Sequence, residues 1–531
     1  MVYDLAIIGG GINGTGIARD AALRGLSVAL FEREDWGAGT TGASTRMIHG
    51  GVRYLLYDIP TTRISSQDAG RIRRIAPHLT WRIPFLWPLY PGGRFMREAT
   101  EAFLSAYDVH AVHKGGLQHA RLNADEARQL EPGLADDVQG ALTLDEWGCD
   151  TFRLAALNAQ DAREHGADVH THTEVTGVLR SGRDVRGVRV RDRITGAERD
   201  VEARVVMNAG GPWVPGVAEL AGVSVPMRPG KGIHVTFERR IGNYGLILEG
   251  VDGRTMFLVP HGAETIVGTT DTDYYGDAAH VDLSITRDEV EYVIEAAARA
   301  LPQARHWRPL RAWAGIRNTI FEWGVGSDDL SRRHEVLNHG ERDGVGGLLS
   351  VVGGKLAAYR IQAEEAVDAV LDQLDRPPVP CTTGDRPLPG GGDVPDFTAL
   401  GAEIPLPAAV LERVWRRVGS RVQRMFADAG PDDLAPVCRS EMVTAAEIRY
   451  AVEVEGCRTL EDLFRHCHVG AGSCDGSDCA APAAQILMEL LDWPPQRYLD
   501  EVEAFRQARW IQRRPVLHGA QLAAEEVRRY G

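Results

Sequence analysis

The stretch Leu5-Ala6-Ile7-Ile8-Gly9-Gly10-Gly11-Ile12-Asn13-Gly14 decides the fold. Its first four residues form a short apolar run, which is typical of a strand buried on both faces. Gly9, Gly11 and Gly14 then give the spacing G-x-G-x-x-G, and a helical pattern follows over residues 17–24. A second apolar strand is expected over residues 27–31. This order of strand, turn, helix and strand predicts a right-handed crossover and a parallel sheet.

Each part of this unit suits a dinucleotide. Gly9 permits a tight turn, Gly11 lets the backbone approach a pyrophosphate, and Gly14 lets the helix pack closely on the strand. The N-terminus of the helix offers free N–H groups to phosphates. Glu32 follows the second strand, where its carboxylate can accept hydrogen bonds from ribose hydroxyls and would repel a 2′-phosphate. The unit therefore predicts a dinucleotide other than NADP, the alternative being a glycine-rich turn without a ligand.

Two further strands run into glycines. One covers residues 205–209 before Gly210, and the other covers residues 348–352 before Gly353 and a helix over residues 356–374. Together with the first turn, three glycine-rich strand ends would meet at one edge of the sheet. NAD does not need that many, whereas an FAD that lies along the whole domain does.

Length, net charge and cysteine content restrict the class of protein to which the chain can belong. A length of 531 residues predicts two or three domains. The net charge of −15 disfavours a global nucleic-acid binder, and seven cysteines argue for a reducing compartment rather than a disulfide framework. We find no targeting segment and no apolar stretch long enough to span a bilayer. The segment 375–397 holds six Pro and four Gly, which predicts a linker.

Six colinear motifs resemble FAD-dependent glycerol-3-phosphate dehydrogenases of the respiratory type, across residues 3–385. They lie at residues 8–16 (IGGGINGTG), 44–55 (STRMIHGGVRYL), 208–213 (NAGGPW), 231–234 (KGIH), 268–273 (GTTDTD) and 353–360 (GGKLAAYR). The resemblance implies that sn-glycerol 3-phosphate is oxidised to dihydroxyacetone phosphate and that electrons pass from FAD to the membrane quinone pool. It is also compatible with a homodimer.

The resemblance implies an α/β fold with a Rossmann-like FAD-binding domain of the glutathione-reductase and D-amino-acid-oxidase type. An antiparallel-sheet substrate domain and a mainly helical C-terminal domain would complete the chain. We expect the FAD-binding domain at residues 1–70, 150–228 and 310–375. The substrate domain is expected at residues 71–149 and 229–309, the linker at residues 376–397 and the C-terminal domain at residues 398–531.

The substrate is a small dianion, and its pocket needs cations, because arginine forks match phosphate oxygens. Matching the family motifs, we expect Arg53, Tyr54, Arg332 and Lys355 on the phosphate side. His234 is expected to take the hydroxyl proton, and Arg317 to stabilise the developing alkoxide. Thr270 and Asp271 are expected as polar neighbours.

The same matching gives the cofactor contacts. They are Gly9, Gly11, Ile12, Asn13, Gly14, Glu32, Arg33, Thr41, Ser44, Arg46, His49, Gly50, Gly51, Ala209, Gly210, Trp213, Gly354, Lys355 and Leu356.

Residues 71–97 form a basic, aromatic segment. They hold six Arg and five aromatic residues, with no Asp or Glu. Cations attract anionic lipid headgroups and Trp and Tyr favour the membrane interface, so we expect a peripheral contact with an anionic lipid surface near a quinone entry. The chain would then lie in the cytoplasm on the inner face of the cytoplasmic membrane. The alternative is that the segment forms an interdomain packing surface or part of the core of the substrate domain.

Five of the seven cysteines lie beyond residue 437. Cys474 and Cys479 form C-x4-C, with Cys438 upstream, which resembles the C-terminal extension of the anaerobic enzyme's large subunit. That pattern supplies four thiolates to a [2Fe–2S] cluster, but here Ser440 stands at the second position. Cys467 and His468 have the wrong spacing to substitute. A domain that has lost its cluster is therefore favoured over an intact cluster.

Two other functions remain open from the sequence. A flavin-dependent amine or amino-acid oxidase would share the fold and produce hydrogen peroxide. A flavin-binding electron-transfer subunit would bind FAD without oxidising a substrate of its own.

Overall fold

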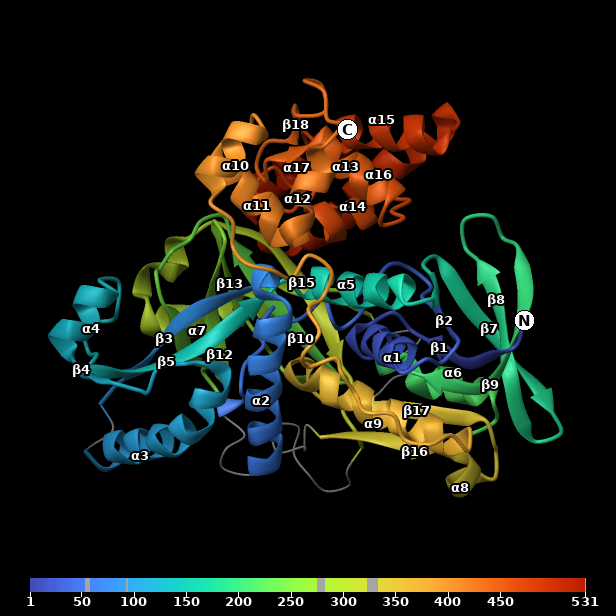
Figure 1. The fold of residues 1–531 in the computed structure, drawn as a ribbon. Coiled ribbons are helices and arrows are strands. Elements are labelled where there is room, and N and C mark those ends of the chain that lie inside the picture. Colours follow the sequence, from blue (N-terminus) through green and yellow to red (C-terminus); the bar gives the residue numbers. More distant parts are fainter. Residues whose placement is uncertain (53–57, 92–93, 275–281, 322–332, 531) are drawn as a thin grey trace.

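The computed structural model describes all residues except 53–57, 92–93, 275–281, 322–332 and 531. The side chains of residues 94–97 and 530 also fall outside the description. Three bodies make up the chain: two sheet-based ones side by side and a helical one above them (Figure 1). The α/β class is confirmed. No helix among the described residues combines the length and apolar character needed to cross a membrane.

The first body is built on an eight-stranded sheet. Four neighbouring strands run parallel: β17 (Leu348–Gly353), β9 (Glu198–Asn208), β1 (Tyr3–Ile8) and β2 (Val28–Phe31). β6 (Asp168–His170) extends this parallel set beyond β2, and β16 (His334–Asn338) pairs antiparallel with β17. The antiparallel hairpin β7 (Thr173–Ser181) and β8 (Asp184–Asp192) pairs with β9.

Helices cover one face of this sheet. They are α1 (Ile12–Leu23), α2 (Ile59–Ile75), α5 (Thr151–Glu164) and α9 (Tyr359–Gln373), and their apolar residues join one buried cluster with β1 and β2. The other face packs on the β7–β8 hairpin and α6 (Val214–Leu220). The α8 helix (His339–Asp343) lies between β16 and β17 in the chain. Burial on both faces explains the continuous apolar run of β1.

The second body is a nine-stranded sheet, mostly antiparallel. Its strands are β14 (Thr272–Asp273), β10 (Gly230–Phe237), β13 (Glu264–Gly268), β12 (Thr255–His261), β11 (Gly245–Glu249), β3 (Thr80–Leu89), β5 (Gly140–Cys149) and β4 (Arg121–Asn123), with β15 (Pro309–Arg317) beside β10. α7 (Arg287–Ala300) packs on it, and α3 (Arg94–Ala111) and α4 (Ala124–Leu130) lie at its far end (Figure 1).

Two expectations need correction here. β15 pairs with β10 along its whole length, so residues from 310 to 317 belong to the second sheet and not to the first body. The described aromatic residues of the basic segment 71–97 do not form an outer patch, because Trp81, Phe85 and Trp87 on β3, and Tyr90 after it, are all buried or half-buried. Phe85 is buried, Trp87 packs on Phe103, and the Arg73 guanidinium lies over the Trp147 ring. Phe85 and Trp87 therefore pack within the second body, and Arg73 on α2 packs against it from the first body, as in the alternative interpretation of the segment.

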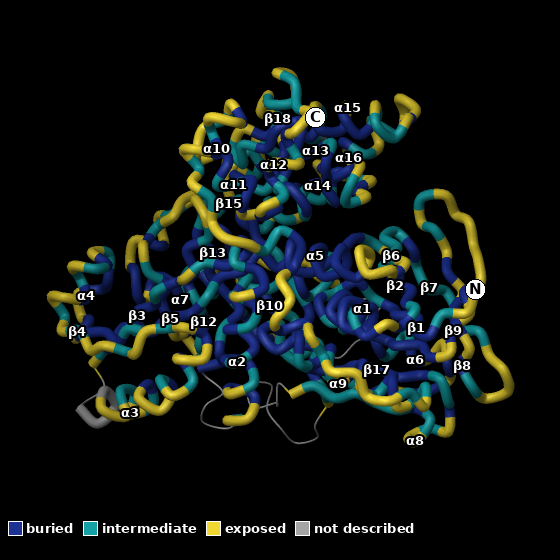
Figure 2. Tube along the Cα trace, in the orientation of Figure 1, coloured by how far each residue is buried: buried dark blue, intermediate teal, exposed yellow. Residues whose placement is uncertain are grey.

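The third body is mainly helical. It contains α10 (Phe397–Glu403), α11 (Ala408–Val418), α12 (Val422–Phe426), α13 (Ala445–Glu453), α14 (Leu460–Cys467), α15 (Ala480–Leu491), α16 (Pro495–Arg513) and α17 (Gly519–Tyr530), with a small hairpin of β18 (Pro436–Cys438) and β19 (Val443–Thr444). The segment before α10 lies on the first body, where the buried Arg19 side chain donates to the Thr383 and Arg386 carbonyls. Figure 2 shows a buried band where the third body meets the others.

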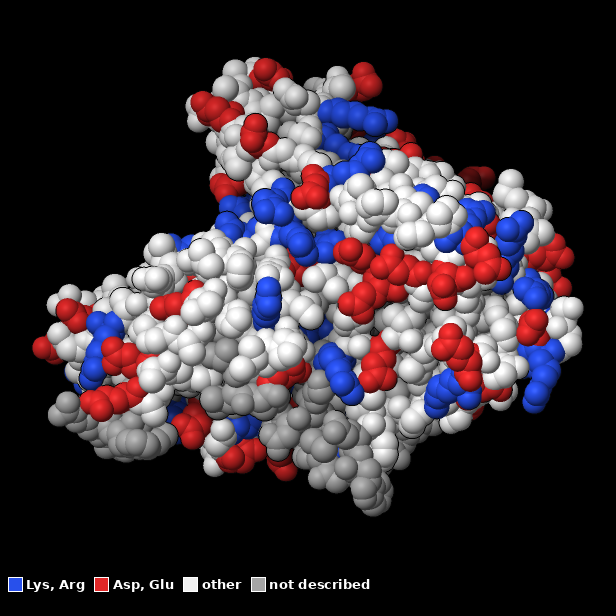
Figure 3. Space-filling view, turned by 60° about the horizontal axis from the view of Figure 1, so that its bottom comes forward, with Lys and Arg blue, Asp and Glu red and all other residues white. Residues whose placement is uncertain are grey.

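Charge is spread unevenly over the surface. On the face drawn in Figure 3, acidic side chains form a band across one half, and basic side chains are scattered among them. This distribution agrees with the net charge of −15.

Candidate functional site

Three glycine-rich turns meet at one edge of the first sheet. Ile8 pairs with Asn208, which in turn pairs with Ser350 on β17, so the parallel strands β1, β9 and β17 end side by side. Their turns open onto a cavity of about 650 Å³. Parallel strands place ligand sites at their carboxyl ends, so this edge is where the fold offers a site.

Two glycines of the first turn, Gly9 and Gly14, have no room for a side chain. Gly9 has a φ of +104°, and a Cβ there would lie 2.7 Å from the Ala209 carbonyl oxygen. A Cβ on Gly14 would lie 1.8 Å from the Gly9 oxygen, so Gly14 lets α1 start tightly against β1. Gly11 differs, because its Cβ would meet only the Thr41 hydroxyl, at 3.4 Å, beside the cavity. The space over Gly11 therefore suits a group that approaches the backbone closely.

Glu32 lies at the end of β2 and lines the cavity. Its carboxylate accepts hydrogen bonds from the backbone N–H of Gly10 at 2.6 Å and of Glu34 at 2.8 Å. Burial raises the pKa of Glu32, although these two bonds oppose the rise. Nearby, the Arg33 guanidinium lies 4.5 Å from the centre of the Trp213 ring. These groups suit the sugar and ring of a nucleotide.

Most of the predicted cofactor residues line this one cavity. Besides Gly9, Gly11 and Glu32 they are Ile12, Asn13, Arg33, Thr41, Ser44, His49, Ala209, Gly210, Trp213, Gly354, Lys355 and Leu356. A cradle of glycines, helix N-terminal N–H groups, a carboxylate and an arginine fits a dinucleotide such as FAD.

Four predicted cofactor residues do not line it. Gly14 packs on Gly9, as described above. The Arg46 guanidinium lies 3.3 Å from the ring of His261, away from the cavity, and burial lowers the pKa of Arg46. A Cβ on Gly50 would strike the Tyr107 hydroxyl and Ser66, and the Gly51 N–H donates to His49 at 3.1 Å. Gly50 and Gly51 thus shape the backbone beneath the site.

A smaller cavity of about 180 Å³ adjoins the first and contains His234 and Arg317. The buried His234 ring stacks on Trp313, and its Nε2 lies 2.9 Å from the Thr45 hydroxyl. Its Nδ1 has no hydrogen-bond partner among the described residues. Burial, followed by the charges of Arg317 and Arg46, lowers the pKa of His234 to about 3. The imidazole is therefore neutral near pH 7.

Arg317 ends β15 at the junction of the two cavities. It forms an ion pair with Asp271 and donates to the Thr270 carbonyl at 3.1 Å. The Thr270 hydroxyl accepts from the Ile233 N–H at 2.9 Å, which ties the segment to β10. Thus the sequence-predicted His234, Arg317, Thr270 and Asp271 come together, and Lys355 lines the adjoining cavity. Arg53, Tyr54 and Arg332 lie outside the described residues.

Sequence reasoning missed two residues at this site, Thr45 and Trp313. Thr45 stands inside a quoted motif but has no feature that separates it from its neighbours. Trp313 lies on β15, which the sequence does not place in this sheet. Its register opposite His234 could have been found only from the strand pairing.

The candidate metal ligands are also brought together. Cys438, Cys474 and Cys479 form one group, with their sulfur atoms all within 4.8 Å of one another.

Comparison with known proteins agrees with this geometry. The family model described as FAD dependent oxidoreductase matches residues 4–360, and that of the C-terminal domain of alpha-glycerophosphate oxidase matches residues 381–498. The chain is 35% identical, over 99% of its length and 95% of the relative's, to a component chain of the anaerobic glycerol-3-phosphate dehydrogenase of Escherichia coli K12. It is 32% identical to the aerobic glycerol-3-phosphate dehydrogenase of Bacillus subtilis, over 87% of this chain and 86% of that one.

Among solved structures, the glycerol-3-phosphate dehydrogenase of Bacillus halodurans complexed with FAD superposes with a TM-score of 0.78 at 25% identity. The match covers 98% of this chain and 96% of that one. A glycine oxidase from Geobacillus kaustophilus matches 71% of this chain and 96% of its own with a TM-score of 0.55 at 21% identity, which shows a shared fold alone.

Proposed function

The chain belongs to the family of FAD-dependent glycerol-3-phosphate dehydrogenases, and on that premise we propose how its residues carry the oxidation of sn-glycerol 3-phosphate to dihydroxyacetone phosphate. The observation that carries the proposal is the pair of adjoining cavities. The larger offers a glycine cradle, and the smaller offers a neutral histidine beside an arginine.

The oxidation removes two electrons and two hydrogens from the C2 carbinol. When bound, FAD supplies the acceptor for the C2 hydrogen and its electron pair. The hydroxyl proton goes to a base, for which the neutral His234 is the candidate. Thr45 orients the ring through Nε2, and Trp313 holds it by stacking. The dianionic substrate would raise the low pKa of His234 and so make it a better base.

Arg317 is the candidate for stabilising negative charge on the C2 oxygen. Asp271 and the Thr270 carbonyl fix its guanidinium, so it is oriented before the substrate arrives. Lys355 is proposed on the phosphate side. We keep Arg53, Tyr54 and Arg332 as phosphate-side contacts in the proposal, on the strength of the motifs alone.

The test is anaerobic reduction of the bound flavin. Addition of sn-glycerol 3-phosphate to the purified yellow protein should bleach its visible flavin band, and glycerol without phosphate should not. Arg317→Ala should slow the bleaching by about 10²–10³-fold while the FAD content stays unchanged. Bleaching by an amino acid, with hydrogen peroxide in air, would instead favour the oxidase. An unchanged spectrum with glycerol 3-phosphate would overturn the proposal.

We further propose a quinone as the electron acceptor and a peripheral contact with the cytoplasmic membrane. The apolar side chains Val109, Val112 and Leu117 are more than 60% exposed at one end of the second body, which supports a contact there rather than at β3. The double variant Val109→Glu/Val112→Glu should lose flotation with anionic vesicles, whereas Val527→Glu, equally exposed on α17, should keep it. No flotation of the unmodified protein would overturn this part, and a mass measurement in solution would test the homodimer.

A further inference from the structure

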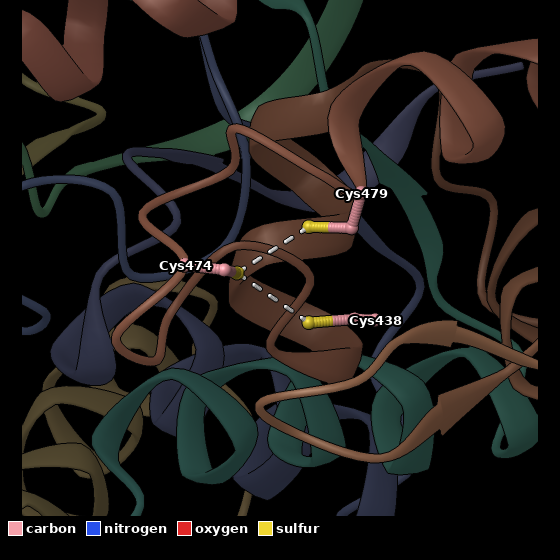
Figure 4. A group of neighbouring side chains, drawn as sticks. All are labelled: Cys438, Cys474 and Cys479. Atoms are coloured by element: carbon pink, nitrogen blue, oxygen red, sulfur yellow. Dashed lines mark hydrogen bonds between the residues drawn. The ribbon is translucent and has the colours of Figure 1, made fainter.

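A group of sulfur and oxygen atoms in the third body lies apart from the flavin site. Cys438 ends β18, and Ser440 follows in the turn of the β18–β19 hairpin. Cys474 lies in the loop after α14, and Cys479 directly precedes α15. Figure 4 shows the three cysteine side chains converging from these separate segments on one point. Cys438 and Cys479 are buried, and Cys474 is half-buried.

The spacing of these atoms is that of ligands around one ion. The Cys474 sulfur lies 4.0 Å from that of Cys438 and 3.8 Å from that of Cys479. The Ser440 hydroxyl oxygen lies 3.0 Å from the Cys474 sulfur and 3.5 Å from the Cys438 sulfur. Thiolates that sit about 2.3 Å from a tetrahedral zinc stand about 3.8 Å apart. The three sulfurs, all within 4.8 Å of one another, therefore lie close to the separation of thiolates on one zinc ion, and the Ser440 oxygen lies beside two of them.

A [2Fe–2S] cluster does not fit this set. Such a cluster takes two ligands on each iron, normally four thiolates, and the pairs on the two irons are spread apart. Here three sulfurs and the serine oxygen crowd around one point. No other described group completes a fourth thiolate or imidazole. Cys467 donates to the Leu463 carbonyl, and His468 Nε2 lies 2.8 Å from Asp150.

We propose that Cys438, Cys474 and Cys479, with the Ser440 oxygen as the fourth ligand, bind a single zinc ion. Zinc has no geometric preference of its own and accepts both sulfur and oxygen ligands. Cys479 directly precedes the 12-residue helix α15, whose first turn holds its backbone in place. The backbone closes over Ser440, because a Cβ on Gly472 would lie 2.7 Å from the Ser440 oxygen.

The ion would have a structural role, because its loop is tied to the second body. The buried Arg311 side chain on β15 donates to the Ala471 carbonyl, and its guanidinium lies 3.9 Å from the Asp475 carboxylate. Cys474 stands between these two residues in sequence. Zinc would therefore fix the loop that joins the third body to the strand ending at Arg317.

The first experiment is metal analysis of the purified full-length flavoprotein. We expect about one zinc per chain, no acid-labile sulfide, and a visible spectrum of flavin alone. Two irons with two sulfides per chain would overturn the proposal. So would the absence of stoichiometric metal both as purified and after incubation of the reduced protein with zinc.

Variants and a spectroscopic probe locate the ion. Cys474→Ala should lose the zinc, whereas Cys381→Ala, at a half-buried cysteine outside the group, should keep it. Ser440→Ala leaves the fourth position to water and should weaken zinc affinity. Cobalt in place of zinc should give thiolate charge-transfer and tetrahedral d–d bands in a difference spectrum of the unmodified protein. Octahedral cobalt bands, or zinc retained by Cys474→Ala, would contradict the assignment even if one variant folds poorly.

Discussion

At the scale of single residues, the most specific prediction concerns His234 as the base that takes the hydroxyl proton. This histidine is buried, neutral and oriented by Thr45 and Trp313. Replacing it by Gln keeps a polar side chain of similar size but removes the base. His234→Gln should slow flavin reduction by glycerol 3-phosphate about 10²–10⁴-fold, with FAD content unchanged. Rapid-mixing absorbance under anaerobic conditions measures this, and a rate within twofold of the unmodified enzyme would rule out the base.

The same histidine makes stability depend on pH. Its folded pKa is about 3, against an ordinary value of 6.5, so between these values the unfolded chain binds a proton that the folded chain does not. The free energy of unfolding therefore falls as the pH drops below about 6.5. Gln cannot take up that proton, so His234→Gln should lose less stability than the unmodified protein on going from about pH 7 to pH 5. Urea midpoints at the two pH values give the comparison, and equal losses would contradict it.

Single residues also show which parts of the site can be predicted from the sequence and which cannot. His234 and Asp271 lie in two of the quoted motifs, which are enough to select them, whereas Arg317 lies outside all six and is selected only by matching the family sequence around it. Arg46 is predicted at the cofactor from its motif, but its φ of 57° turns the side chain toward His261. A left-handed backbone at a non-glycine residue has no signal in one sequence.

At the scale of elements, a substitution in the turn between β1 and α1 can weaken FAD binding without disturbing the fold. A Cβ on Gly11 meets little but the Thr41 hydroxyl, yet it enters the cavity. Gly11→Ala should therefore fold normally but bind FAD at least about tenfold more weakly, a loss of about 1.4 kcal/mol. Gly216→Ala is the matched control, because nothing lies within 4 Å of its Cβ in α6. FAD titration of the two deflavinated variants is the measurement, and equal affinities would contradict the placement of the dinucleotide over Gly11.

The sequence predicts element types better than element boundaries. Its pattern starts the first helix at residue 17, but α1 begins at Ile12. Gly14 and Gly16 lower helix propensity there, so the helical pattern starts only after them. Tertiary contact overrides propensity, because a side chain at either glycine would strike Gly9 or Tyr359. β15 is misplaced for a related reason, since its partner β10 lies more than 70 residues away in sequence.

At the scale of the whole molecule, a buried ionic network joins the third body to the first. Arg153 on α5 donates to both oxygens of Glu455 at 2.6 and 2.7 Å, and its Nε donates to the Arg417 carbonyl. His466 Nδ1 lies 2.6 Å from Glu455, and its Nε2 lies 3.3 Å from Asp35. Partners some 300 residues apart leave no trace in the pattern of one sequence, which is why a separate C-terminal domain could be expected but not its docking.

Removing one charge from this network tests how firmly the bodies are joined. Glu455→Gln leaves the Arg153 guanidinium buried without its carboxylate, which should lower the free energy of unfolding by about 3–5 kcal/mol. The control is Glu198→Gln, which breaks the exposed ion pair with Arg191 and should cost less than about 1 kcal/mol. Urea unfolding gives both values, and limited proteolysis of residues 376–397 reports whether the third body has loosened. Because that segment lies against Arg19, faster cleavage in Glu455→Gln alone would show that the bodies separate before they unfold. Equal free energies of unfolding for the two variants would contradict the prediction and would mean that Arg153 finds water or another acceptor.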